Sequence, residues 1–496
     1  MFPRIDRTAT AVGILLCLLI AHACGPAFAD DNRARPAADA LHVLIITGQG
    51  DHDWRGTVPF LRRILTDTGR FDVRVCEAPT GLTARTLAGF DVLVDDCGAS
   101  TSDGETGKAV AGFVESGKGL VITRGALSSC MNAHAAHANS QAVQSDSSGT
   151  IPAYWPAVPS SGSPSRVHFL EVTIAQPGHP IGQGVQSEFK IADAVYRGMS
   201  VRPGAEVIAT VLADAESGPN KTEPVLITSG HGKGRVLCTA LGHDLAAMQE
   251  TVFITTFARG TEWAATGNVT LPPDLGPPRP SPGAVRALLI TGGHDHETAF
   301  YTLFEGYKDL AWLPVASSTT AFANDLRGRY DVLIMYDFSR DLDEKGKKNL
   351  RDFVESGKGI VVLHHALLNY QQWRWWYEEV VGGSYRLKSE DGVPSSTVKD
   401  GQQIFVTPSG EHPITAGIAP FHIVDETYKR MWISPQVKPI LITDNQSSDR
   451  SLAWIGPCAS SRVVAIQLGH GHSAFGHPTY RAIVHNAILW SAGRIK

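Results

Sequence analysis

Histidine and carboxylate side chains gather in four short motifs in the second half of the chain. The motifs are His294-Asp295-His296, His364-His365, Asp425-Glu426 and the final residue of Leu468-Gly469-His470. Imidazoles and carboxylates are protein ligands of catalytic zinc ions, and they also act as general acids and bases near neutral pH. The residue types therefore indicate metal-assisted or acid–base chemistry on a small molecule.

Two overlapping roles are expected for these groups. The candidate catalytic residues are Asp425, Glu426, His365 and His470. The candidate ligands of a divalent metal, with zinc the first choice, are His296, His365 and His470. Adjacent side chains on an extended segment point to opposite sides, so only one of His364 and His365 can face the site, and we expect it to be His365. Asp425 has a second possible role, which is to brace the turn before Tyr428.

Five further residues are expected to bind the substrate. They are His294, Asp295, Tyr428, Trp373 and Trp376. The tryptophans belong to an aromatic cluster soon after the histidine pair, and the flat faces of sugar rings pack well on aromatic side chains. Closing of the hydrophobic core by these tryptophans is the alternative.

Most of the motifs occur twice in the chain, in the same order. Residues 47–52 (TGQGDH) return as residues 291–296 (TGGHDH), and the seven residues 113–119 (FVESGKG) recur letter for letter as 353–359. Leu-Gly-His at 241–243 and 468–470 forms a third pair. The chain is therefore a tandem duplication, with copies predicted over 41–270 and 284–496 and a proline-rich linker over 271–283.

The two copies differ at the positions that would carry chemistry. Where the second copy has His364-His365, the first has Arg124-Gly125, and where the second has Asp425-Glu426, the first has Asp193-Ala194. We therefore expect the chemistry in the second copy, and a binding or scaffolding role for the first. His179 and His412 precede proline in polar turns, where a structural role is expected.

Short apolar runs alternate with helical patterns in both copies. Runs such as 41–47 and 285–291 are typical of strands that are buried on both faces, and helices are predicted over 105–116, 249–265, 299–310, 343–356 and 479–492. This alternation predicts α/β domains with mainly parallel sheets. The motifs follow strands, and ligands of such sheets bind at the carboxyl ends of the strands.

The N-terminus has the pattern of a secretory signal peptide over residues 1–29. Arg4 and Arg7 precede an apolar stretch at 11–21, and Ala27-Phe28-Ala29 offers a cleavage site. We therefore expect export to the periplasm or the extracellular space after cleavage near Ala29, with a loose leader over 30–40. No later stretch approaches the roughly 20 apolar residues of a membrane span, so no transmembrane segment is expected in the mature chain.

The composition leaves a small soluble substrate or a protein as the partner. A net charge of −5 with 19% charged residues gives no electrostatic reason to expect nucleic acid as a partner.

The mature chain keeps five cysteines, Cys76, Cys97, Cys130, Cys238 and Cys458. Free thiols are expected, with a Cys76–Cys97 disulfide as the alternative.

The motif set resembles the ThuA-like family, which is associated with trehalose utilisation. The resemblance rests on residues 47–54 (TGQGDHDW), the histidine pair, residues 424–428 (VDETY) and the Leu-Gly-His of each copy. It implies two tandem flavodoxin-like domains, similar to class I glutamine amidotransferases, and a carbohydrate as the small-molecule partner. The cysteine nucleophile of those amidotransferases is missing, because the matching turns read Thr123-Arg124-Gly125 and Leu363-His364-His365.

Two functions follow from these observations. The first is an exported enzyme that acts on a carbohydrate or an oxidised sugar derivative by hydrolysis, elimination or isomerisation, assisted by a divalent metal. The second is a non-catalytic module that binds a sugar or docks a partner. No phosphate-binding or dinucleotide-binding glycine motif is present, so no nucleotide cofactor is expected.

Overall fold

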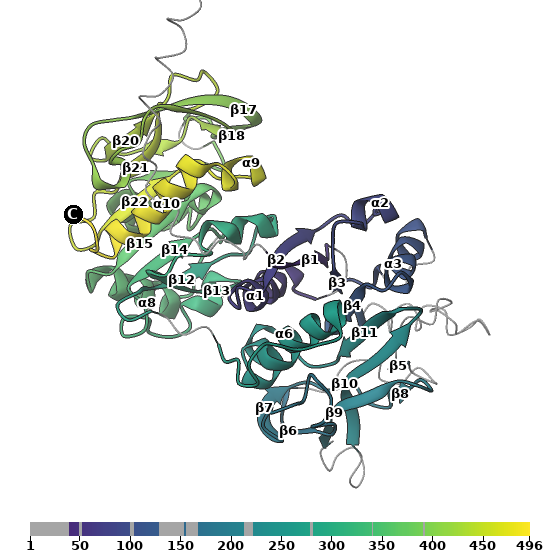
Figure 1. Ribbon diagram of the computed structural model, residues 1–496. Coiled ribbons are helices and arrows are strands. Elements are labelled where there is room, and N and C mark those ends of the chain that lie inside the picture. The colour runs from purple at the N-terminus through teal and green to yellow at the C-terminus, as the bar shows by residue number, and fades with distance from the viewer. Residues whose placement is uncertain are drawn as a thin grey trace, which may run out of the picture.

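The computed structural model contains two α/β domains, each built on a nine-stranded sheet (Figure 1). It describes residues 39–48, 52–99, 104–127, 153–154, 167–212, 222–277, 281–339, 341–389 and 392–496. We call the part up to residue 277 the N-terminal domain and the part from residue 281 the C-terminal domain. The predicted signal peptide, nearly all of the predicted leader, and Cys130 lie outside the described residues.

The N-terminal domain has a mixed sheet with the strand order β2-β1-β3-β4-β11-β10-β9-β6-β7. The first five strands are parallel, and the last four run antiparallel to their neighbours. In this order the strands are Phe71–Cys76, Leu41–Ile46, Val92–Asp95, Gly119–Ile122, Gly234–Thr239, Thr222–His231, Glu206–Leu212, His168–Ile174 and Glu188–Asp193. The main helices are α1 (Trp54–Thr66), α3 (Glu105–Glu115) and α6 (Thr251–Thr266).

The C-terminal domain repeats this topology strand for strand. Its order is β13-β12-β14-β15-β22-β21-β20-β17-β18, and the first five strands are again parallel. In this order the strands are Leu310–Val315, Val285–Ile290, Val332–Met335, Gly359–Leu363, Val463–Ile466, Ser451–Ile455, Lys438–Ile442, Thr397–Pro408 and Phe421–Lys429. The main helices are α8 (Glu344–Glu355) and α10 (Pro478–Ser491). The identical strand order confirms the tandem duplication.

The FVESGKG repeat joins a helix to the next strand in each domain. Lys118 pairs with Asp91 at 2.9 Å, and Lys358 pairs with Asp331 at 3.3 Å, each acid lying just before the neighbouring strand. The last glycine of the repeat begins β4 or β15, and a Cβ atom there would lie 2.5 Å or less from backbone atoms of α6 or α10. The repeat therefore has a structural role, which is close packing of the last helix on the sheet.

The helix predicted over 299–310 is wrong. The segment forms only a short 3-10 helix, η3 (Thr298–Leu303), and β13 already begins at Leu310. Gly306 has a φ of 81°, which ends helical geometry and turns the chain into the strand. The apolar positions that indicated a helix, such as Phe300 and Phe304, are buried side chains of this irregular stretch.

The His-Pro turns are structural in both domains, as expected. Nδ1 of His179 accepts a hydrogen bond from the backbone N–H of Ile181, and Nδ1 of His412 accepts one from Ile414, both at 3.2 Å. Each imidazole also packs against a tryptophan of the last helix, with ring centroids 5.0 Å apart.

Four of the cysteines lie in described residues, and all four are free thiols. They are Cys76, Cys97, Cys238 and Cys458. Burial raises the pKa of Cys97 well above its ordinary value, as do the charges of Asp95 and Asp96, so this thiol is inert. None of the helices among the described residues is long and apolar enough to span a membrane.

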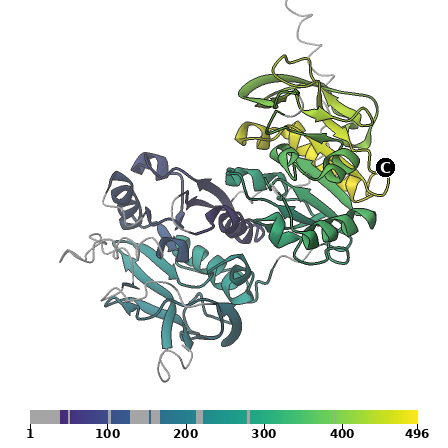
Figure 2. The same cartoon turned by 180° about the vertical axis from the view of Figure 1, so that it is seen from behind.

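The domains contact each other through α1 and the start of the C-terminal domain (Figures 1 and 2). Arg62 on α1 forms an ion pair of 2.5 Å with Glu305, and both side chains are largely buried. The guanidinium of Arg63 donates to the backbone carbonyl of Trp312 at 3.0 Å. The interface is thus held by directed polar contacts as well as by packing.

Candidate functional site

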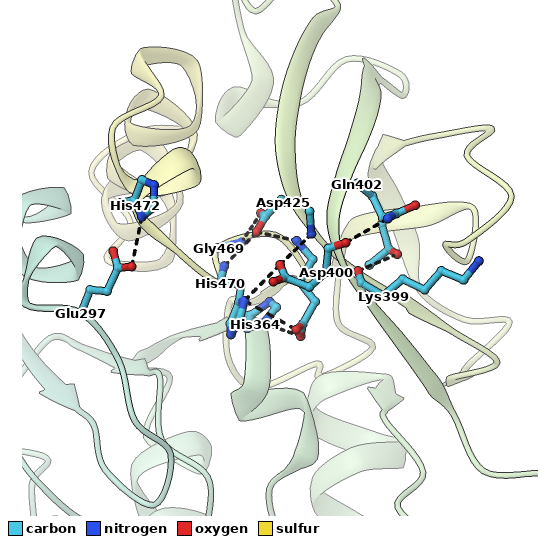
Figure 3. A network of polar contacts seen from close by, with 12 residues as sticks. Glu297, His364, Lys399, Asp400, Gln402, Asp425, Gly469, His470 and His472 are labelled. Atoms are coloured by element: carbon cyan, nitrogen blue, oxygen red, sulfur yellow. Dashed lines mark hydrogen bonds and ion pairs between the residues drawn. The ribbon is translucent and has the colours of Figure 1, made fainter.

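Three predicted motifs of the C-terminal domain meet at the carboxyl edge of its sheet. His364 directly follows β15, His470 follows β22, and Glu426 lies on β18. One ligand atom from each of these three residues lies within 4.8 Å of the other two. Figure 3 shows His364 and His470 side by side in this group. We call His364, Glu426 and His470 the triad; among the described residues, no other group of three histidine, cysteine or acidic side chains is arranged in this way.

Glu426 lies between the two imidazoles of the triad. Its Oε1 is 3.3 Å from Nε2 of His364, and its Oε2 is 3.5 Å from Nδ1 of His470. The side chain of His364 is 1% exposed and that of His470 is 32% exposed. The triad therefore has a buried inner side and a solvent-accessible outer side.

Contacts behind His364 fix its ring and its tautomer. Nδ1 lies 2.6 Å from the backbone carbonyl of Gln467, which can only accept, so Nδ1 carries the proton. Nε2 faces the Tyr428 hydroxyl at 2.9 Å and the Glu426 carboxylate at 3.3 Å, and it holds a lone pair when the ring is neutral and a second proton when the ring is charged. A lone pair beside a carboxylate needs a proton or a cation between them, and a histidine that donates its other N–H to a carbonyl is the usual arrangement of a metal ligand.

Glu426 is ionised at neutral pH. Burial acts to raise its pKa, but the hydrogen bond and charge of His364, the charge of His470 and the hydrogen bond of Tyr428 outweigh it. The pKa consequently lies below the ordinary value. The triad therefore offers a negative oxygen ligand together with two imidazoles.

Asp425 braces the turn that carries His470. The backbone N–H groups of Gly469 and His470 donate to its carboxylate at 2.6 and 3.0 Å, and the N–H of Glu426 donates at 2.9 Å. Burial raises its pKa, while the charge of His364 and these hydrogen bonds oppose the rise. With both oxygens engaged by the backbone, the geometry favours the bracing role over the predicted catalytic one.

The structure places His364 in the triad, where the sequence favoured His365. His364 has a φ of 46° and begins the 3-10 helix η4 (His364–Leu368), so the alternation of an extended strand does not apply. His365 instead turns inward, where its Nε2–H donates to the carbonyl of Tyr336 at 2.6 Å. Its ring stacks on His294 with centroids 4.5 Å apart. His365 therefore lies behind the site and packs against His294 and Tyr336.

The predicted metal ligand His296 lies apart from the triad. Its Nε2 faces the Tyr301 hydroxyl at 3.3 Å, and burial lowers its pKa to about 4, so it is neutral at physiological pH. The predicted set of His296, His365 and His470 therefore does not come together, and the side chains that do are His364, Glu426 and His470.

The predicted aromatic platform belongs to the hydrophobic core. Trp376 is 1% exposed within the short π-helical stretch η5 (Trp375–Val381), and Trp373 packs against the same core. Neither residue lines the cleft beside the triad. Tyr428 is also buried, and its hydroxyl contacts His364, so it positions that imidazole and is not placed to bind a substrate directly.

A cleft of about 450 Å³ opens beside the triad, a size within the range of small-molecule sites. The predicted residues that line it are Asp295, His296, Asp425 and His470. Among the lining residues that were not predicted are one arginine and three acids: Arg55, Glu77, Glu297 and Asp400. Asp400 approaches Nδ1 of His470 at 3.7 Å, and Glu297 pairs with His472 at 3.0 Å at the rim (Figure 3).

The corresponding place in the N-terminal domain is filled by an arginine. Arg124 stands where the triad has His364, and its guanidinium donates to the backbone carbonyls of Ala194 and Ala240 and packs over the Tyr196 ring at 4.2 Å. The carboxylate of Asp193 accepts from two backbone N–H groups at 2.8 and 3.0 Å, as Asp425 does in the second copy. The N-terminal domain thus keeps the braced turn of the site but has an arginine in the position of His364.

Gly125 leaves room for another histidine in the N-terminal domain. A Cβ atom at Gly125 would lie 2.5 Å from the His52 ring, so His52 occupies the volume that His365 would need. His52 in turn contacts Asp96 at 2.7 Å. The two domains therefore present different chemistry at the same edge of the sheet.

A mixed sheet whose first five strands are parallel, with helices packed against it, defines a flavodoxin-like α/β protein. Residues 42–264 and 286–491 each match the model of the ThuA family, described as trehalose utilisation. The chain belongs to the ThuA family and carries two copies of its domain.

Solved structures of similar proteins each cover just under half of the chain. A ThuA-like protein from Parabacteroides merdae is 25% identical, covering 47% of this chain and 92% of its own, with a TM-score of 0.38. A ThuA-like protein from Bacteroides uniformis is 19% identical, covering 44% of this chain and 96% of its own, with a TM-score of 0.35. No curated protein matches the chain.

Proposed function

We propose that the C-terminal domain binds a divalent metal, zinc by preference, and uses it to transform a carbohydrate or an oxidised sugar derivative. The observation that carries this proposal is the triad of His364, Glu426 and His470. Two imidazoles and one carboxylate form a ligand set of catalytic zinc sites, which keep a further position for water or substrate. The inner side of the triad is braced by Gln467 and Tyr428, and the outer side faces the cleft.

The chemistry of such a centre fits an oxygen-rich substrate. A metal polarises a carbonyl or hydroxyl oxygen and lowers the pKa of bound water, which serves hydrolysis, elimination and isomerisation alike. Asp400, 77% exposed beside His470, is placed to exchange a proton with a ligand in the cleft. The carbohydrate itself is inferred from the family, whose description is trehalose utilisation.

Metal content of the purified full chain tests the proposal. We expect about one zinc ion per chain after purification with added zinc and without chelator. The ion should be lost in a His364→Ala/His470→Ala variant and in Glu426→Gln. It should be retained in His296→Ala, and in the control His422→Ala, which removes an exposed histidine on the same strand as Glu426. A metal-free wild type, or retention by the double variant, would refute the proposal.

The N-terminal domain favours a second candidate function, a non-catalytic sugar-binding module. That domain keeps the fold and the Asp193 brace although Arg124 occupies the ligand position. If saccharide binding survives in the triad variants and the zinc-loaded wild type turns over none of the sugars it binds, the module replaces the enzyme.

A further inference from the structure

The cleft beside the triad is walled by both domains. Arg55 and Glu77 belong to the N-terminal domain, and they line the same cleft as Asp295, Asp400 and His470 of the C-terminal domain. In both views α1 lies against the C-terminal domain (Figures 1 and 2), and Arg55 of its first turn contacts His296 there. The site of one copy is thus bounded by residues that lie more than two hundred positions earlier in the sequence.

Arg55 is held in one orientation at this boundary. Its Nε–H donates to the backbone carbonyl of His296 at 3.1 Å, and its guanidinium lies over the Trp54 ring at 4.2 Å. A terminal nitrogen approaches the Asp295 carboxylate at 3.5 Å, but that carboxylate is 88% exposed and binds only weakly. An arginine fixed through Nε and its planar face presents its remaining donors in a defined direction.

The interface around Arg55 keeps the two walls together. Oε1 of Glu77 accepts from the backbone N–H of Thr298 at 2.7 Å, directly beside the 294–297 turn. The buried Arg62–Glu305 pair and the contact of Arg63 with Trp312 lie further along α1 and do not line the cleft. Arg62 and Arg63 therefore only hold the two domains together, whereas Arg55 holds them together and also faces the cleft.

The charges of the cleft indicate what Arg55 can bind. Its described lining includes five carboxyl residues, Glu77, Asp295, Glu297, Asp400 and Asp425. Arg55 is the one permanently cationic residue among the described residues that line the cleft. Carboxylates accept hydrogen bonds from hydroxyl groups and a guanidinium donates to hydroxyl or carbonyl oxygens, whereas the acidic lining opposes an anion. The combination suits an uncharged ligand that carries many hydroxyl groups.

The C-terminal domain does not supply this group itself. In the aligned motifs His52 matches His296, so Arg55 corresponds to Ala299. We propose that Arg55 is a substrate-binding residue that the N-terminal domain contributes to the site of the C-terminal domain, so that one complete site requires both copies. This inference rests on the proposed function, because it concerns the ligand of the same site.

Binding of trehalose to the zinc-loaded full chain, measured by calorimetry, tests the composite site. Loss of a hydrogen bond from a charged donor should weaken binding roughly tenfold or more in Arg55→Ala. Arg63→Ala should leave the affinity within about twofold and lower the thermal midpoint, because Arg63 holds the interface outside the cleft. Arg85→Ala, an exposed arginine of the same domain, should change neither quantity.

The outcomes separate this inference from the proposed function. Unchanged trehalose affinity in Arg55→Ala, or an equal loss in Arg63→Ala, would overturn the composite site while the metal centre stands. A wild type that binds zinc through the triad but binds neither trehalose nor any other neutral saccharide would overturn the proposed function, and the composite site would fall with it.

Discussion

Replacing Asp425 by asparagine distinguishes a structural brace from a catalytic acid. The carboxylate accepts from three backbone N–H groups, those of Gly469, His470 and Glu426. Asparagine keeps one acceptor oxygen and turns an NH₂ group towards a backbone donor. Each lost bond to a charged group costs about 1.5–3 kcal/mol, and removal of a buried charge offsets part of this. We expect a net loss of about 2–4 kcal/mol in the free energy of unfolding.

Calorimetry of the full chain measures this loss. For a domain of roughly 200 residues, 1 kcal/mol shifts the thermal midpoint by about 2–4 °C, so the transition of the C-terminal domain should fall by about 4–16 °C. Asp193→Asn is the matched control, because it breaks the same contacts in the N-terminal domain and should lower that domain's transition instead. An Asp425→Asn chain with an unchanged midpoint and no turnover would show that Asp425 acts in the reaction and that the bracing argument is wrong.

Two further predictions concern the position of Arg124 in the N-terminal domain and the buried acid Asp337. Arg124→His combined with Ala194→Glu should create a second triad and raise the zinc content from one to two ions per chain. An unchanged zinc content would contradict the conclusion that Arg124 and Ala194 occupy the positions of His364 and Glu426. Burial raises the pKa of Asp337 to about 6, against hydrogen bonds from Ser318 and Asn369. Because the fold disfavours its charged form, stability should decline by about 3 kcal/mol as the pH rises from below 3.8 through 6. Asp337→Asn should remove that decline in urea titrations at pH 4.5 and 7.5, and equal pH dependence in both chains would refute the assignment.

The sequence predicted the central parallel strands of both sheets closely, for a physical reason. A parallel strand covered on both faces is apolar along nearly its whole length, so runs such as Val285–Ile290 stand out without any periodicity. Helical periodicity misled at 299–310, because aromatic side chains at helical spacing also fill the core around a short 3-10 helix. Local patterns report burial more reliably than they report backbone geometry.

The site was predicted in part. The histidine pair and His470 follow the neighbouring strands β15 and β22, so these motifs were expected to meet at one edge. Glu426 lies on β18 at the far end of the sheet, and it was named from its sequence motif alone. His364 was missed because its left-handed backbone is not visible in the sequence. Asp400 reaches the site through an irregularity in the pairing of β17 with β18, and Arg55 reaches it through domain packing. Contacts of this kind have no local signal, so no motif could have indicated them.

Comparison of the copies separates folding from chemistry. The shared features hold the fold together: the FVESGKG repeat packs the last helix, the His-Pro turn caps a loop, and Asp193 and Asp425 brace the same turn. The differing positions are Arg124 against His364 and Ala194 against Glu426, and these decide whether the edge of the sheet holds a buried guanidinium or a cluster of metal-ligand type. The first copy has no such cluster at its own sheet edge among its described residues, and its Arg55 instead lines the cleft of the second copy.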